Sequence, residues 1–402
     1  MKKHLCFAAA LLIAASVFAV PAAAVEVEEG YDYDRFRGQN ITLNVFNWGE
    51  YISDGGDGSM DVIQEFEDLT GITVKYNTFA SNEEMYTKLK SGGAEYDVII
   101  PSDYMVGKMI GEGMLAPLNY ANIPNAAYIG AAYKGLEYDP QDAYSVPYTW
   151  GTVGIVYNTT MVDKPVDSWA ILWDADYAGD ILMFNNSRDA FAIASCLLGN
   201  SMNPTAVEEV EVAAEKLKEQ KPLVQAYVMD EIFDKMEGGE AALAPYYAGD
   251  AITMIAENPD LAFAIPKEGT NYFVDAMCIP ATCQNKEAAE MFINFMCETE
   301  VALANAEYIG YSTPQTETEQ LLPEELKNSE IAYPSAEVLA NTETFTVLPD
   351  DINAAMDKAW SDVRSSDEQG SKMLVPIVLG VAVLAIIVIF WRRNVQKKRN
   401  DY

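Results

Sequence analysis

Four short stretches of the chain join an apolar run to aromatic rings, hydroxyls or carboxylates. "NVFNWGEYI", "YDVIIPSDY" and "AALAPYYAGD" each end a strand-like pattern in such groups, whereas "FVDAMCIPA" carries a single acidic residue, Asp275, inside an apolar run. Aromatic faces attract cations, and a carboxylate taken out of water needs a positive partner. These residue types therefore favour a site that stacks on and neutralises a small cationic molecule.

The first part of the body alternates strand and helix patterns, which must position these groups. Strand patterns cover 41–48, 72–79 and 96–102, and helical patterns cover 59–71, 81–93 and 103–113. The alternation predicts a parallel sheet with helices on both faces, and Ser81 and Glu84 are spaced as a capping box. Open α/β sheets bind ligands at the carboxyl ends of their strands. We therefore expect Trp48–Tyr51 and Ser102–Tyr104 to line one pocket wall.

A second region begins near residue 144, and the length of the body suggests two domains. Its predicted elements are a helix at 206–220, strands at 241–247, 261–266 and 273–281, and a helix at 286–298. Tyr246, Tyr247 and Asp250 follow the strand pattern "AALAP" and extend the same polar and aromatic theme.

Several classes of chemistry are excluded by the single histidine, His4, which lies in the first 24 residues. A body without histidine has no Ser-His-Asp or Cys-His catalysis and no His-ligated zinc. We accordingly expect no enzyme activity, no metal and no cofactor. Spacing alone does not decide whether Cys196, Cys278, Cys283 and Cys297 form disulfides or are free core residues.

The charge of the body is strongly acidic. Residues 25–371 contain 18 Lys and Arg against 60 Asp and Glu, a formal charge of −42. Such a field makes nucleic acid an implausible partner and favours cations, although most of these carboxylates serve solubility.

The two ends of the chain carry targeting patterns. Residues 1–24 combine two lysines, an apolar run and a small-residue ending, which predicts a secretory signal peptide cleaved after Ala24 rather than a membrane helix. Residues 373–391 are uncharged and long enough, at about 28 Å, to cross a bilayer. The linker 364–372 precedes this segment and the basic tail 392–402 follows it, so the body would face outward and the tail inward. The alternative for 373–391 is a buried core helix.

Six segments in order resemble bacterial spermidine/putrescine-binding proteins, the extracytoplasmic receptors of ABC importers. They are "VFNWGEYI", "YNTFASNEEMYTKLKSGGAEYDVIIPSDYMV", "YSVPYTWGTVGIVYN", "SWAILWDADYAGDILM", "IPKEGTNYFVDAMCIPA" and "YIGYSTP", and the likeness spans about residues 40–363.

The resemblance implies a two-lobed α/β fold of the periplasmic-binding-protein type II class, with a polyamine between lobes that close by a hinge. One lobe would comprise residues 38–149 and 275–320, and the other 150–274 and 321–365. The implied partners are the polyamine and the membrane subunits of an importer.

Carried over motif by motif, the resemblance implies these ligand-binding residues: Trp48, Gly49, Glu50, Tyr51, Ser102, Tyr104, Asn186, Asp189, Tyr247, Asp250, Phe273, Asp275 and Tyr311. Asp275 matches the family's central amine-binding aspartate, and Tyr247 and Phe273 stand where stacking tryptophans occur. Asn186 departs from the carboxylate of spermidine-preferring members, whereas Asp250 matches an acidic position of putrescine-preferring ones. A further contact near Glu343 is not aligned.

Each of these residues also has a structural interpretation. Tyrosines can pack at a domain rim, Asp189 can pair with Arg188 or cap a helix, Asp250 can cap a helix, and Glu50 can be solvated. Two other functions also remain open, which are a receptor for a neutral solute such as a sugar and a secreted glycosidase with two carboxylates. A structural surface protein is the fallback.

Overall fold

The computed structural model describes residues 25–92 and 95–365. The predicted signal peptide at 1–24, the predicted span at 373–391 and the basic tail lie outside these residues, as does most of the linker 364–372. Within the described ranges, no helix is long and apolar enough to cross a membrane.

In the described part of the chain, ten strands form one mixed sheet in the order β2-β1-β3-β9-β4-β7-β5-β6, with β10 paired to β9 and β8 to β4. Their bounds are β1 Thr42–Trp48, β2 Thr73–Phe79, β3 Val98–Ile99, β4 Ser145–Asn158, β5 Ile181–Phe184, β6 Val224–Val228, β7 Leu243–Tyr247, β8 Leu261–Ala264, β9 Thr270–Cys278 and β10 Thr342–Glu343.

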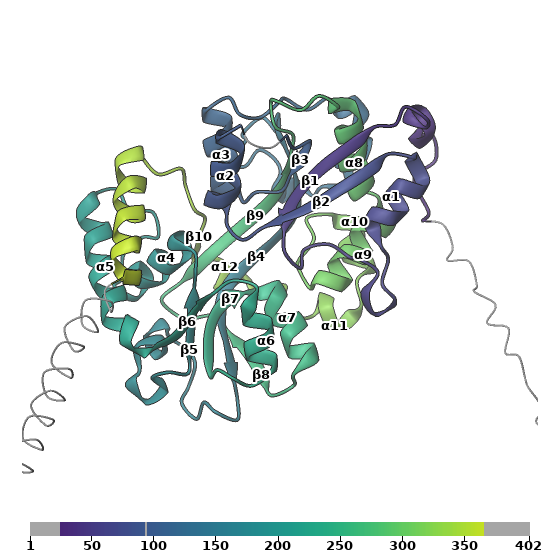
Figure 1. Ribbon diagram of the computed structural model, residues 1–402. Helices are drawn as coiled ribbons and strands as arrows, with labels where there is room; N and C mark the ends of the chain where they lie inside the picture. Colours follow the sequence, from purple (N-terminus) through teal and green to yellow (C-terminus); the bar gives the residue numbers. More distant parts are fainter. Residues whose placement is uncertain (1–24, 93–94, 366–402) are drawn as a thin grey trace, which may run out of the picture.

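Two long antiparallel strands, β4 and β9, run through the middle of the molecule and connect its two lobes (Figure 1). The end of β9 pairs with β3 through Cys278 and Ile99, while the far part of β4 pairs with β7 and β8. We call the part built on β1–β3 the first lobe and the part built on β5–β8 the second lobe.

Helices cover both lobes. The first lobe carries α1 Val62–Thr70, α2 Asn82–Lys90, α3 Asp103–Gly111, α8 Lys286–Met296 and α9 Thr299–Ile309. The second lobe carries α4 Ser187–Leu197, α5 Val207–Gln220, α6 Glu231–Glu237 and α7 Ala248–Glu257. Three short helices follow α9, namely α10 Thr316–Leu321, α11 Glu324–Lys327 and α12 Ala336–Leu339.

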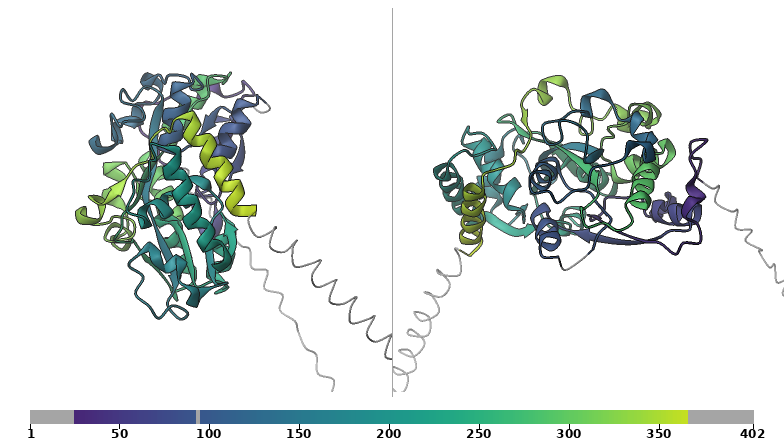
Figure 2. Two further views of the ribbon diagram at one scale, coloured as in Figure 1. Left: turned by 90° about the vertical axis from the view of Figure 1, so that its left-hand side faces the viewer. Right: turned by 90° about the horizontal axis from the view of Figure 1, so that it is seen from above.

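The described chain begins and ends on opposite lobes, as Figure 1 and the right-hand view of Figure 2 both show. Val25 lies on the first lobe, where its side chain is buried in the core. The closing helix, residues 350–365, lies against the second lobe, where Trp360 contacts the rings of Phe191 and Tyr227.

Local sequence signals explain the helix bounds in the first lobe. Asp61 caps α1 by accepting a hydrogen bond from the backbone of Gln64, and Gly71 ends the helix at a positive φ of 71° that favours glycine. Ser81 likewise caps α2 at Glu84. The predicted box is altered in one detail, because the Glu84 carboxylate accepts from Ala80 rather than from Ser81.

The parallel sheet expected for the first part of the body is confirmed for its three strands. Strands β1, β2 and β3 are parallel to one another, but β9 is antiparallel to β3 and to β4. Strand β9 returns from the second lobe, and a strand that enters from the opposite side must run in the opposite direction. The exact lobe bounds given above stay a prediction.

All four cysteines of the body are free thiols in the structure, and Cys196, Cys278 and Cys297 are buried. This agrees with the interpretation of the cysteines as small core residues.

Candidate ligand-binding site

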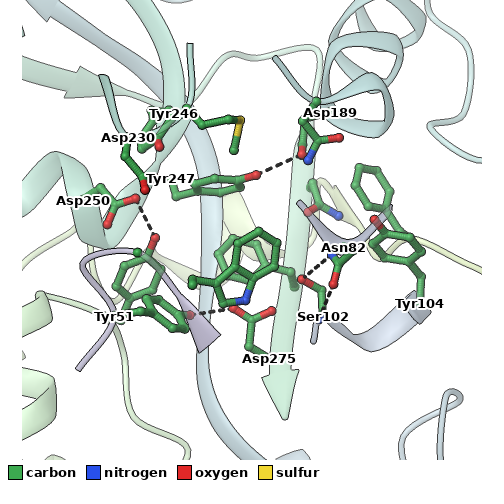
Figure 3. Close-up of a pocket in the computed structure, with 18 residues that line it drawn as sticks. Tyr51, Asn82, Ser102, Tyr104, Asp189, Asp230, Tyr246, Tyr247, Asp250 and Asp275 are labelled. Carbon is green, nitrogen blue, oxygen red and sulfur yellow. Dashed lines mark hydrogen bonds between the residues drawn. The ribbon is translucent and has the colours of Figure 1, made fainter. Parts of the chain in front are cut away.

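A pocket lies between the lobes, where the paired strands β4 and β9 pass from one lobe to the other, and Figure 3 shows the side chains around it. Its empty volume is about 580 Å³, counting the part open to solvent. The lining residues are Trp48, Gly49, Tyr51, Asn82, Ser102, Tyr104, Asn186, Asp189, Met229, Asp230, Tyr246, Tyr247, Asp250, Asn271, Phe273, Asp275, Tyr311 and Phe345.

The structure brings together twelve of the thirteen predicted site residues, and Glu50 is the exception. Glu50 is exposed and has a φ of +48°. It borders a separate acidic depression that also includes Glu237 and Glu257 of the second lobe. Glu50 therefore borders this depression instead of the pocket, and its role as a ligand contact stays a prediction.

Asp275 lies on β9 and is only 4% exposed. Its Oδ2 accepts a 2.6 Å hydrogen bond from the Tyr51 hydroxyl, which also bonds Thr149. Its Oδ1 is buried and has no partner among the described residues. Burial raises the pKa of Asp275 to about 6, while the neighbouring hydroxyls of Ser102 and Tyr51 oppose the rise. The unpaired oxygen is thus available to a ligand donor.

Asp250 lies in the first turn of α7 and does not cap that helix, since the capping position is Tyr247. Its Oδ2 accepts a 2.9 Å hydrogen bond from the hydroxyl of Tyr311, which belongs to the segment after α9. Burial, followed by the nearby carboxylates Asp230 and Glu50, raises the pKa of Asp250 well above its ordinary value. The Tyr311 ring lies so close to Gly249 that a β-carbon there would overlap it.

Asp189 lies in the first turn of α4, and its Oδ2 accepts a 3.0 Å hydrogen bond from the Tyr247 hydroxyl. Asn186 caps this helix by accepting from the backbone of Arg188. The Arg188 guanidinium donates to Asn203 and to the Thr346 carbonyl. The suggested Arg188–Asp189 pair is therefore absent from the ion pairs of the described chain, and burial raises the pKa of Asp189 to about 7.

A polar group from the first lobe completes the wall below Asp189. Asn82 exchanges two hydrogen bonds of 3.1 Å with Ser102, one to its hydroxyl and one from its backbone N–H. Tyr104 donates a 2.9 Å hydrogen bond to Glu83 and stacks edge-on against Phe345. These contacts hold Ser102 and Tyr104 in place before any ligand enters.

Aromatic rings form the apolar wall. Phe273 contacts the edge of Tyr247 at 5.6 Å between ring centroids, and Trp48 lies against Phe79 at 4.5 Å. The indole N–H of Trp48 is buried without a hydrogen-bond partner within the described ranges. Figure 3 shows the Tyr247 ring lying between the Asp250 side of the pocket and Asp189.

Six lining residues were not predicted as ligand contacts: Asn82, Met229, Asp230, Tyr246, Asn271 and Phe345. Tyr246 belongs to the predicted cluster at the end of a strand, and Asn82 begins the helix after β2. For both residues, the local sequence therefore offered a sign of a position near the pocket. Phe345 and Asn271 come from segments with no such signal. Glu343, whose role was left open, uses its carboxylate to accept hydrogen bonds from Ser201 and Met202.

The electrostatic character of the pocket follows from its three buried aspartates, Asp189, Asp250 and Asp275. None of them takes part in the ion pairs of the described chain, and their protein donors are neutral tyrosine hydroxyls. No group of three or more His, Cys, Asp or Glu side chains that could hold a metal occurs in residues 25–92 and 95–365. The pocket is therefore built to receive a ligand with several positive hydrogen-bond donors.

A two-lobed α/β protein with one such pocket at the crossing strands has the architecture of a solute receptor. A family model described as "Bacterial extracellular solute-binding protein" matches residues 61–333, and the chain belongs to this family. The family binds solutes, which agrees with the expectation that the chain is not an enzyme.

Among its relatives is the spermidine/putrescine-binding periplasmic protein of Escherichia coli (strain K12). It is 38% identical over 307 residues, which cover 76% of this chain and 86% of the relative. The putrescine-binding periplasmic protein SpuD of Pseudomonas aeruginosa (strain UCBPP-PA14) is 28% identical over 345 residues, covering 81% and 92% of the two chains.

Solved structures confirm the two-lobed fold. A Listeria monocytogenes protein is 38% identical with a TM-score of 0.77, covering 80% of this chain and 98% of the other. The spermidine/putrescine ABC transporter substrate-binding protein PotD of Streptococcus pneumoniae is 37% identical with a TM-score of 0.67, covering 81% and 99%.

Proposed function

We propose that this protein is an extracytoplasmic receptor that binds a linear polyamine, putrescine or spermidine, and delivers it to the membrane subunits of an ABC importer. The observation that carries the proposal is the set of three buried aspartates, Asp189, Asp250 and Asp275, none of which forms an ion pair within the described residues.

The physical argument concerns the cost of these groups in the empty pocket. A buried carboxylate without a counter-charge is strongly unfavourable, and an ammonium group is equally costly to bury alone. A polyamine supplies ammonium groups a few carbons apart. When an ammonium group pairs with a buried carboxylate, the pairing offsets the cost of burying both charges. Its methylenes would lie on the rings of Phe273, Tyr247 and Trp48, and such faces attract a cation by about 0.5–2 kcal/mol each.

The roles of individual residues follow from this arrangement. Asp275 would anchor one ammonium group with its free oxygen, and Asp189 or Asp250 would receive another. We propose the twelve predicted residues that line the pocket as ligand contacts, and the lobes as residues 38–149 with 275–320 and 150–274 with 321–365. The names of relatives that bind spermidine and putrescine support this assignment.

The topology of the whole chain is a further part of the proposal. Residues 1–24 would direct export, and residues 373–391 would anchor the body to the outer side of the cell membrane through the linker 364–372. The basic tail 392–402 would stay in the cytoplasm. Such tethering raises the local concentration of receptor beside the importer without any new contact.

The test is calorimetry on residues 25–371 after unfolding and refolding to remove carried-over ligand. We expect at least one of putrescine, spermidine and spermine to bind with micromolar affinity or tighter, which corresponds to about −8 kcal/mol. A panel of sugars and amino acids serves as comparison. Binding of a neutral sugar with none of the three polyamines bound would overturn the proposal in favour of the neutral-solute alternative.

A further inference from the structure

Asp230 is a fourth aspartate on the pocket wall that neither the sequence motifs nor the function proposed above explains. It immediately precedes α6 of the second lobe and is exposed to solvent. It is absent from the ion pairs of the described chain. Figure 3 shows Asp230 on the same side of the pocket as Asp250, opposite Asp189.

The Asp230 carboxylate touches the other lobe. A β-carbon built on Gly49, in the loop after β1, would overlap Oδ2 of Asp230, so only glycine allows this close approach. Gly49 belongs to the first lobe and Asp230 to the second. The contact therefore exists only while the two lobes lie together at this point.

Two carboxylates of the pocket wall, Asp230 and Asp250, are influenced by each other and by Glu50 in the separate depression. Burial, together with Glu50 and Glu231, raises the pKa of Asp230, even though part of the side chain remains in water. Asp230 and Glu50 in turn help to raise the pKa of Asp250. When the lobes meet without a ligand, like charges from both lobes are brought together, which is unfavourable.

We propose that Asp230 is a ligand-selecting residue: beside Asp250, it helps to receive the second ammonium group of a linear diamine and so favours dications over monocations. The inference rests on the proposed polyamine function. A single ammonium held by Asp275 leaves the repulsion between Asp230, Asp250 and Glu50 in place. A ligand that spans the pocket with a second ammonium removes that repulsion.

Because Asp230 contacts Gly49 across the lobe junction, it selects in the closed form. When the lobes are open, Asp230 is separated from the first lobe, and the preference for dications over monocations is lost. The contact between Gly49 and Asp230 thus links the preference for dications to the closure of the lobes.

The first test compares putrescine with 1-aminobutane, which has the same carbon chain and one ammonium group. Calorimetry gives the ratio of their dissociation constants for the wild type, for Asp230→Asn and for Asp234→Asn, the matched control on the exposed side of α6. We expect Asp230→Asn to lower the preference for putrescine by about twofold to fivefold, as for an exposed pair of opposite charges. Asp234→Asn should preserve the preference, and added salt should narrow the difference.

The second test is a double-mutant cycle between the two lobes. Gly49→Ala should weaken putrescine binding, because its methyl group overlaps the Asp230 carboxylate. The same change should weaken binding less in an Asp230→Ala background, where the overlapping atoms are gone. Thermal unfolding of each variant shows that the fold is retained.

The outcomes separate this inference from the function on which it rests. A wild type that prefers putrescine, with Asp230→Asn retaining the full preference, overturns the role of Asp230 and leaves the polyamine receptor standing. Additive effects of Gly49→Ala and Asp230→Ala overturn the link to closure. A wild type that binds no polyamine overturns the proposed function and this inference together.

Discussion

Tyr51 donates a 2.6 Å hydrogen bond to one oxygen of Asp275, while the other oxygen of the same buried carboxylate has no partner among the described residues. Tyr51 follows β1, and Asp275 lies on the crossing strand β9. The bond orients the carboxylate and leaves its second oxygen for a ligand. A neutral donor does not cancel the charge, so the empty site keeps an uncompensated aspartate.

Asp275→Asn should weaken polyamine binding at least tenfold, because a buried ammonium that loses its counter-charge typically costs several kcal/mol. The empty variant should unfold at the same temperature as the wild type or higher, since the substitution removes an unpaired buried charge. Calorimetry and thermal unfolding measure the two effects. Unchanged affinity would show that Asp275 does not anchor the amine.

Gly249→Ala tests the contact between α7 and the Tyr311 ring. The added β-carbon would overlap that ring and displace its hydroxyl from Asp250, so we expect ligand binding to weaken by about tenfold or more. Gly111→Ala is the control, because a β-carbon there meets nothing within 4 Å. Equal affinities for the two variants would contradict the role of Tyr311 in holding Asp250.

The stability of the empty protein should fall as pH rises from about 4 to 7, as far as Asp189 and Asp275 contribute. Their pKa values rise from 3.8 to about 7 and about 6, so in this window the folded state binds more protons than the unfolded state. Their favourable contribution to the free energy of unfolding is fully present below pH 4. It is lost as the pH rises above their pKa values in the folded state. Urea unfolding of the wild type and of an Asp189→Asn, Asp275→Asn double variant would check this, and equal slopes against pH would refute it.

The same groups predict the pH dependence of binding. A cationic ligand favours the ionised carboxylates, so binding should release protons and weaken as pH falls from 8 to 5. Calorimetry in two buffers with different ionisation enthalpies counts the protons. Asp189→Asn should lower the count, and a count of zero in the wild type would mean that these carboxylates do not face the ligand.

The proposed anchor predicts where the chain is accessible. Protease added to intact cells, with any wall removed, should digest the body and spare the part after Trp391. Full-length protein should fractionate with membranes, and a chain that ends at Ser371 should be released. If the shortened chain stays with the membrane, or if a tag after Tyr402 is reached from outside, the assigned topology is wrong.

Local sequence was sufficient for much of the first lobe. The bounds of α1 follow from the Asp61 cap and from Gly71, whose positive φ suits glycine, because capping depends on groups only three or four residues apart. The motifs around Trp48, Ser102 and Asp275 also indicated pocket residues, because strand ends in an open sheet meet at one edge.

Only the tertiary structure decided the rest of the site. Glu50 lies two residues after Trp48 in the same motif, yet it lies outside the pocket, at a backbone φ of +48° that no local sequence pattern indicated. Asp230 and Phe345 enter the pocket because β4 and β9 bring the second lobe and the C-terminal segment against the first. Sequence alone determined which side chains could bind a cation. Which of them share one cavity depends on contacts between residues far apart in the chain, where no local spacing reports the outcome.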